Sequence, residues 1–80
     1  MEPRISGNYV TNRGAITYAY DGFWTEVEKK VRWDAKVRRD GELVASPKGV
    51  VEDVPRNTDI DALVRANIEA AIEDEINAGA

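Results

Sequence analysis

The fold of this chain is decided by residues 20–42, which read YDGFWTEVEKKVRWDAKVRRDGE. Asp-Gly pairs stand near both ends of this stretch, at Asp21-Gly22 and at Asp40-Gly41. An Asp-Gly pair between alternating runs is a strong hairpin signal, because both residues of a type I′ turn need a positive φ. The two pairs therefore predict one strand over residues 23–39 with a tight turn at each end, the centre of an antiparallel β-meander.

Side chains between the two turns alternate in character. All even positions from 26 to 38 are charged, whereas the odd positions include most of the apolar residues, namely Phe23, Val27, Val31, Trp33, Ala35 and Val37. A period of two is that of a strand, and a helix would place Trp33 and Val37 on its polar side. The alternation predicts a strand whose odd-numbered face is turned toward the core.

The two predicted turns also set a strand register. Two-residue loops at both pairs oppose Tyr20 with Phe23, Ile16 with Val27, Arg39 with Glu42, Val37 with Val44, Val31 with Val50 and Lys29 with Glu52. Opposed apolar pairs and opposed charges stabilise a sheet, so this register agrees with an apolar odd face. Because Pro47 cannot donate to a ladder, the third strand is expected at an edge, either bulged or split over Pro47-Lys48-Gly49.

A helix is predicted after the sheet. The segment Pro55-Arg56-Asn57 ends the strand pattern, and Thr58 is the predicted N-cap. An apolar residue then recurs every four positions, which is the stripe of a core-facing helix, at Ile60, Val64, Ile68, Ile72 and Ile76.

The predicted fold class is α+β, with two layers. A three- or four-stranded antiparallel β-meander carries one C-terminal amphipathic helix packed on one face. The predicted core consists of Ile16, Tyr18, Val27, Val31, Trp33, Val37, Val44, Leu63, Val64, Ile68 and Ile72.

The predicted domain covers residues 9–77. Residues 1–8 lack periodicity and are expected to form a mobile N-terminal arm, and residues 78–80 are expected to form a frayed C-terminus. Whether Tyr9-Val10-Thr11 adds a fourth strand is left open by the pattern.

Composition narrows the chemistry. The chain of 80 residues has no cysteine and no histidine, which removes disulfides, thiolate ligands, the commonest metal ligand and the commonest general base. There is no glycine-rich phosphate loop and no spaced acidic loop for a cation. We therefore expect no catalytic residues, no metal and no cofactor. A signal-peptide pattern and an apolar run of about 18 residues are both missing, which predicts a cytoplasmic protein away from membranes.

Charge is unevenly distributed along the chain. The net charge is −4, but residues 28–49 carry seven basic and four acidic side chains, whereas residues 50–80 carry two basic and eight acidic ones. Either the basic sheet and the acidic helix attract each other within the fold, or one of them forms an interaction surface.

Protein association is the function that the sequence favours. A small core without cysteines, and a short meander with exposed edges, favour pairing with another chain. The predicted module is non-catalytic and binds either a second copy, as a homodimer, or another protein. Tyr20, Phe23 and Trp24 are the candidate interface residues, because large aromatic side chains are common interface anchors.

Weak binding of single-stranded nucleic acid is the alternative. Lys30, Arg32, Lys36 and Arg38 share one face of the predicted central strand, and Trp24 is expected on the same face. Cationic side chains beside an aromatic platform hold single strands through phosphate contacts and base stacking.

Overall fold

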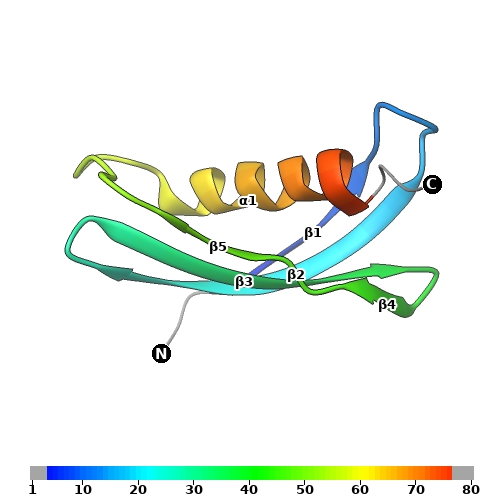
Figure 1. Ribbon diagram of the computed structural model, residues 1–80, viewed down its shortest axis with the longest axis horizontal. Coiled ribbons are helices and arrows are strands. Elements are labelled where there is room, and N and C mark those ends of the chain that lie inside the picture. The colour runs from blue at the N-terminus through cyan, green and yellow to red at the C-terminus, as the bar shows by residue number, and fades with distance from the viewer. Residues whose placement is uncertain (1–3, 77–80) are drawn as a thin grey trace.

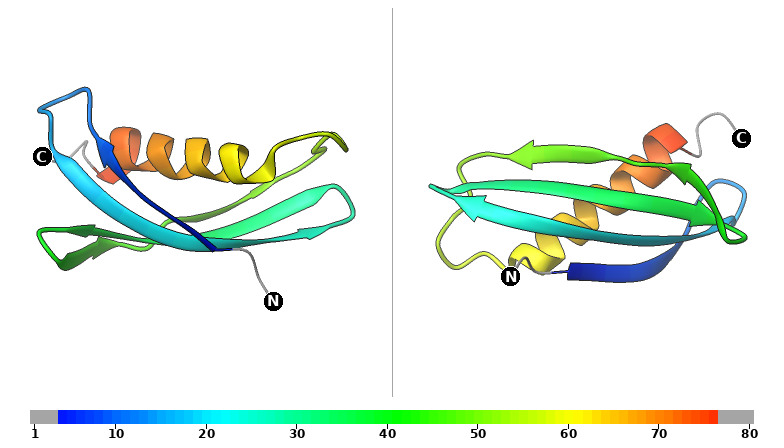
Figure 2. Two further views of the ribbon diagram at one scale, coloured as in Figure 1. Left: turned by 180° about the vertical axis from the view of Figure 1, so that it is seen from behind. Right: turned by 90° about the horizontal axis from the view of Figure 1, so that it is seen from below.

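Five strands and one helix make up the part of the chain that the computed structural model describes, residues 4–76. The elements are β1 (Arg4–Val10), β2 (Thr17–Val27), β3 (Lys30–Arg39), β4 (Glu42–Ala45), β5 (Lys48–Val51), α1 (Ile60–Ala71) and the π-helical segment η1 (Ile72–Ile76). The strands form one antiparallel sheet in the order β1-β2-β3-β4. Strand β5 also pairs with β3, along residues 31–34, whereas β4 pairs with residues 37–39. Helix α1 lies diagonally across one face of the sheet, while no described element covers the opposite face (Figures 1 and 2). The predicted two-layer α+β fold is confirmed.

The first turn lies elsewhere than the sequence predicted. Strand β2 runs without a break through Asp21-Gly22, and the chain reverses at Glu28-Lys29, where φ is 50° and 66°. The predicted pair of Tyr20 with Phe23 was therefore wrong, because Tyr20 lies opposite Val37. The one strand expected over residues 23–39 is a hairpin made of two strands.

The structure requires glycine at position 22 for close packing of two strands and not for a turn. A Cβ atom at this position would lie 2.4 Å from the carbonyl oxygen of Asp34 and 3.1 Å from the Cα atom of Ala35. Glycine within a strand commonly marks such a close approach of a neighbouring backbone. Gly22 therefore allows β3 to approach β2, and the residue does not form a turn.

The second turn was predicted correctly. Asp40-Gly41 has φ of 53° and 82°, and Arg39 lies opposite Glu42. A register shift follows between Val37 and Arg38, so Val37 pairs with Ala45 instead of Val44.

The third strand of the expected meander is split, one of the two forms that the proline allowed. Pro47 separates β4 from β5, and its carbonyl accepts a 2.9 Å hydrogen bond from the backbone N–H of Ala35. Because of the register shift, Val31 lies opposite Val51 instead of Val50. Glu52 forms its 3.3 Å ion pair with Lys30, where the sequence predicted Lys29.

Residues 4–8 form most of β1, where the sequence predicted an arm without regular structure. The strand pairs with β2 from Arg4, opposite Phe23, to Val10, opposite Thr17, and Ile5 is buried in the core. A further strand therefore exists at this place, and it covers Arg4–Val10 instead of Tyr9-Val10-Thr11. The rest of the predicted arm and the predicted frayed end lie outside the described residues.

The core lies between the sheet and α1. Its buried apolar residues are Ile5, Tyr18, Tyr20, Val31, Trp33, Ala35, Val37, Val54, Val64, Ile68 and Ile72, and Ile16 and Leu63 pack against them. Two predicted core residues are wrong, because Val27 is 61% exposed and Val44 is 46% exposed. Both errors follow from the register changes described above.

The helix begins one residue later than predicted. Asp59, rather than Thr58, is the N-cap, and its Oδ1 atom accepts a 3.1 Å hydrogen bond from the backbone N–H of Ala62. Val64, Ile68 and Ile72 of the predicted stripe are fully buried against the sheet.

Candidate functional site

The face of the sheet that points away from α1, here called the outer face, has no cover from any described element. Alternation places on it the even positions of β1, β3 and β5 and the odd positions of β2. Its charged side chains are Arg4, Asp21, Lys30, Arg32, Asp34, Lys36, Arg38 and Lys48. These six cations and two anions give the outer face a formal charge of +4. Because the whole chain carries −4, the other residues together carry −8.

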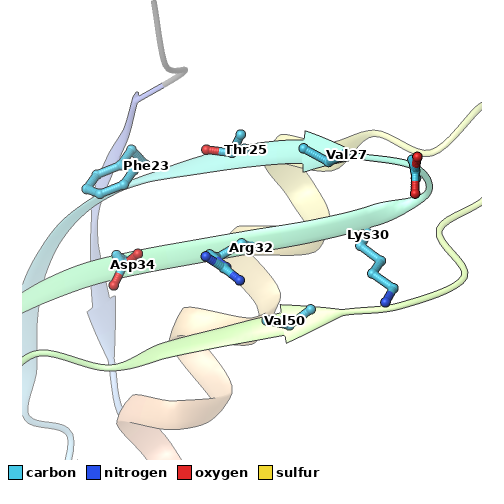
Figure 3. A pocket seen from close by; sticks show the side chains of 8 residues that line it. Phe23, Thr25, Val27, Lys30, Arg32, Asp34 and Val50 are labelled. Carbon is cyan, nitrogen blue, oxygen red and sulfur yellow. The ribbon is translucent and has the colours of Figure 1, made fainter.

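A groove of about 500 Å³ crosses three strands of this face (Figure 3). Its lining residues are Phe23, Thr25 and Val27 of β2, Lys30, Arg32 and Asp34 of β3, Val50 of β5, and Glu28 in the turn. A second hollow of about 680 Å³ shares Phe23 and Asp34 with the first. Three exposed apolar side chains thus lie in a groove that also holds two cations and two carboxylates.

Arg32 occupies the centre of this groove. In the register of the sheet it lies between Thr25 on β2 and Val50 on β5, as Figure 3 shows. Neither neighbour carries a charge, and no ion pair of Arg32 is found within residues 4–76. The Arg32 guanidinium therefore remains available to an anion from outside the chain.

The other cations of β3 and β5 have acidic neighbours. Arg38 forms an ion pair with Asp21 at 3.3 Å, and Lys36 lies directly across from the same Asp21. Lys48 lies directly across from Asp34. Along β3 and β5, Arg32 is therefore the cation whose charge has the least compensation from neighbouring strands.

The acidic residues of the helical segment contact a different set of groups. Asp61 accepts a 2.8 Å hydrogen bond from Trp24 Nε1, Glu69 accepts one of 3.0 Å from the Tyr20 hydroxyl, and Glu73 accepts one of 2.9 Å from the Tyr9 hydroxyl. We call this row of contacts the polar seam. The seam lies on the helix side of the sheet, so it does not neutralise the cations of the outer face.

The surroundings of the polar seam raise the pKa of both of its tyrosines. Burial raises the pKa of Tyr20; the Arg65 guanidinium beside it acts in the opposite direction, and Glu69 raises the pKa further. The hydrogen bond to Glu73 raises the pKa of Tyr9. The two hydroxyl groups donate hydrogen bonds that connect β1 to η1 and β2 to α1.

Three residues of the predicted protein interface separate in the structure. Tyr20 is 4% exposed and belongs to the core, and Trp24 lies on the helix side opposite Trp33. Phe23 alone of the three lies on the outer face, where it is 39% exposed. The displaced turn explains why the three residues separate. Because β2 is continuous, the side chains of Tyr20 and Trp24 lie on the helix side and that of Phe23 lies on the outer face.

The predicted nucleic-acid residues separate in a similar way. Lys30, Arg32, Lys36 and Arg38 share the outer face, as the alternation predicted. Trp24 does not join them, because its indole packs between the sheet and α1 with its Nε1 bonded to Asp61.

Sequence reasoning missed Val27 and Val50 as groove residues. The predicted turn at Asp21-Gly22 assigned Val27 to the core, and the register predicted from Asp40-Gly41 opposed Val50 to the core residue Val31. A signal for the true arrangement was present. Tyr18, Tyr20 and Trp24 all occupy even positions, so a continuous strand places three aromatic side chains on one face.

Comparison of the chain with protein-family models, with curated proteins and with solved structures finds no match. Within residues 4–76, no helix is long and apolar enough to cross a membrane. The same residues contain no group of three or more acidic side chains that could hold a metal ion.

Proposed function

We propose that this chain is a small, non-catalytic protein-interaction module that binds its partner on the outer face of the sheet. The observation that supports this proposal is the position of Arg32. It is a cation without an ion pair among residues 4–76, and it lies in a groove that also contains the exposed apolar side chains of Phe23, Val27 and Val50. Arginine and aromatic residues are enriched at binding hot spots, where neighbouring apolar contacts exclude water from the central charge. A cytoplasmic location stays a prediction from the sequence.

The exposed apolar side chains give a second line of support. Phe23, Val27 and Val50 are 39%, 61% and 53% exposed, and all three line the same groove. Covering apolar surface releases about 25 cal/mol per Å². A partner that covers these three side chains gains affinity from them without any change in the fold.

Photo-cross-linking in the native host tests the proposed function. A benzophenone amino acid replaces Thr25 in the groove in one variant, and replaces the exposed Ala66 of α1 in a matched control. We expect protein adducts from position 25 and none from position 66. Equal adducts at both positions, or none at position 25, would contradict the proposal.

Self-association is the form of this function that the sequence predicted. Two outer faces would bring two surfaces of +4 together, and opposed like charges weaken an interface. A homodimer would therefore form more readily through the edge of β1, which pairs with no other strand than β2 within residues 4–76 and contains no proline. Light scattering over a dilution series tests this form, since a strict monomer at millimolar concentration would exclude the homodimer.

Binding of single-stranded nucleic acid remains the alternative function. The four cations on the outer side of β3 support it, and Phe23 offers one aromatic surface on that face. The position of Trp24 on the helix side removes the predicted stacking platform, and Asp21 and Asp34 oppose phosphate groups. Nuclease-sensitive adducts from position 25 would favour this alternative over protein binding.

A further inference from the structure

We infer that the partner presents an extended peptide segment in which one carboxylate is flanked by two aliphatic side chains, and that Arg32 binds that carboxylate. This inference rests on the proposed function, because it names the chemistry of the partner at the same groove. The charges of the groove residues and the spacing of its apolar side chains support this inference.

The guanidinium of Arg32 determines the central group of the segment. Arginine presents paired N–H donors whose geometry matches the two oxygens of a carboxylate, and this bidentate contact is stronger than a neutral hydrogen bond. The neighbouring Lys30 is already paired with Glu52 at 3.3 Å. A single incoming carboxylate therefore has one preferred position in the groove, opposite Thr25 and Val50.

The spacing of the apolar residues determines what flanks that carboxylate. Phe23 and Val27 lie two positions before and two positions after Thr25 on the same side of β2 (Figure 3). At about 3.3 Å per residue, the two side chains are about 13 Å apart. An extended peptide spans the same distance between residues i and i+4, with residue i+2 on the same side. A segment with aliphatic residues at both ends and Glu in the middle fits this row.

The charge of the groove favours a peptide over a polyphosphate chain. Lys30 and Arg32 are balanced there by Glu28 and Asp34, so the groove as a whole is neutral. Successive phosphates would meet these carboxylates, and affinity for nucleic acid depends on neutralising many phosphates at once. A peptide with a single carboxylate between two aliphatic side chains binds Arg32 and is not repelled repeatedly by Glu28 and Asp34.

Fluorescence anisotropy with defined peptides tests the inference. The probe is a fluorescein-labelled seven-residue peptide, Thr-Val-Thr-Glu-Thr-Val-Thr, blocked at both ends. Two control peptides have the same sequence except that one carries Gln in place of Glu and the other carries Ser in place of both Val residues. A labelled twelve-nucleotide oligothymidine is the fourth probe. We expect the Glu peptide to bind at least tenfold more tightly than each of the other three probes.

Three variants of the protein locate the contact. Arg32→Gln should abolish the difference between the Glu and Gln peptides, while Arg56→Gln, the same change at an exposed loop residue, should preserve it. Arg32→Lys should retain only part of the difference, because an ammonium group lacks the bidentate geometry. Circular dichroism confirms that each variant is folded before its affinity is measured.

Other results would overturn the inference. Equal binding of the Glu and Gln peptides, or an unchanged preference in Arg32→Gln, would remove the carboxylate contact. Tighter binding of oligothymidine would replace the peptide with nucleic acid. If position 25 cross-links to protein while no peptide binds at millimolar concentration, the proposed function stands and the partner chemistry is wrong.

Discussion

Gly22 lies directly opposite Ala35 in the ladder between β2 and β3, and the two strands leave no room for a side chain at position 22. A Cβ atom there would meet the Asp34 carbonyl oxygen at 2.4 Å, and backbone atoms cannot move aside as the end of a flexible side chain can. This approach joins the two longest strands, so it supports both the core and the outer face.

Replacing Gly22 with alanine should destabilise the protein strongly. We expect Gly22→Ala to lower the free energy of unfolding by about 3 kcal/mol, the cost of forcing extra volume into a packed site. Gly41→Ala is the matched control, because a Cβ at Gly41 meets nothing within 4 Å and only its φ of 82° is unfavourable. That control should lose about 1 kcal/mol. Urea denaturation measures both, and equal losses would contradict the close approach.

The turn at Glu28-Lys29 is not optimised. Both residues have positive φ, at 50° and 66°, although neither is glycine or asparagine. Replacing the pair with Asn-Gly should stabilise the protein by about 1 kcal/mol, because these residues adopt a type I′ turn with less strain. For a domain of this size, that gain raises the melting temperature by about 4–8 °C. A lower melting temperature would show that the chain does not turn at these residues.

Trp24 and Asp61 should be energetically coupled. The indole N–H donates to the Asp61 carboxylate at 2.8 Å, which joins β2 to the first turn of α1. A double-mutant cycle with Trp24→Phe and Asp61→Asn should give a coupling energy of about 1 kcal/mol. Asp74→Asn replaces Asp61→Asn in the control cycle, for which we expect no coupling. A coupling energy near zero in the first cycle would contradict the hydrogen bond between Trp24 and Asp61.

Stability should decline above pH 10 through Tyr20. Burial raises the pKa of Tyr20 above its ordinary value of 10.0 in the folded protein, so the unfolded chain loses its proton first. The contribution is therefore complete below pH 10 and is lost as the pH rises through the folded pKa. The difference in unfolding free energy between the native protein and Tyr20→Phe should be constant from pH 7 to 9 and shrink above pH 10. A difference that grows above pH 10 would contradict the sign of the shift.

Much of the fold could be predicted from the sequence because its signals are local. Asp40-Gly41 supplies a turn that needs no tertiary support, and the four-residue apolar period of the helix depends only on its own residues. The turn at Glu28-Lys29 could not be predicted in this way, since neither residue favours positive φ. Contacts between β2 and β3 hold it in place, so tertiary structure overrides the local preference.

The candidate site could be predicted only in part, for the same reason. The four cations of β3 follow from alternation within one strand, and they share the outer face as expected. Val27 and Val50 come to Arg32 from two other strands, so their place depends on both registers. One register was changed by the displaced turn and the other by the shift between Val37 and Arg38. Errors in strand pairing therefore hid the apolar part of the groove.

The assignment of every side chain to the outer or helix side depends on Trp24 lying opposite Trp33. The two-residue turn makes Val27 and Lys30 a hydrogen-bonded pair, so Trp24 and Trp33 form a non-hydrogen-bonded pair with Cα atoms about 4.5 Å apart. Nuclear Overhauser spectroscopy measures this contact directly. We predict a strong signal between the Hα protons of Trp24 and Trp33. Loss of this signal, together with cross-strand contacts between Tyr20 and Phe23, would contradict the account.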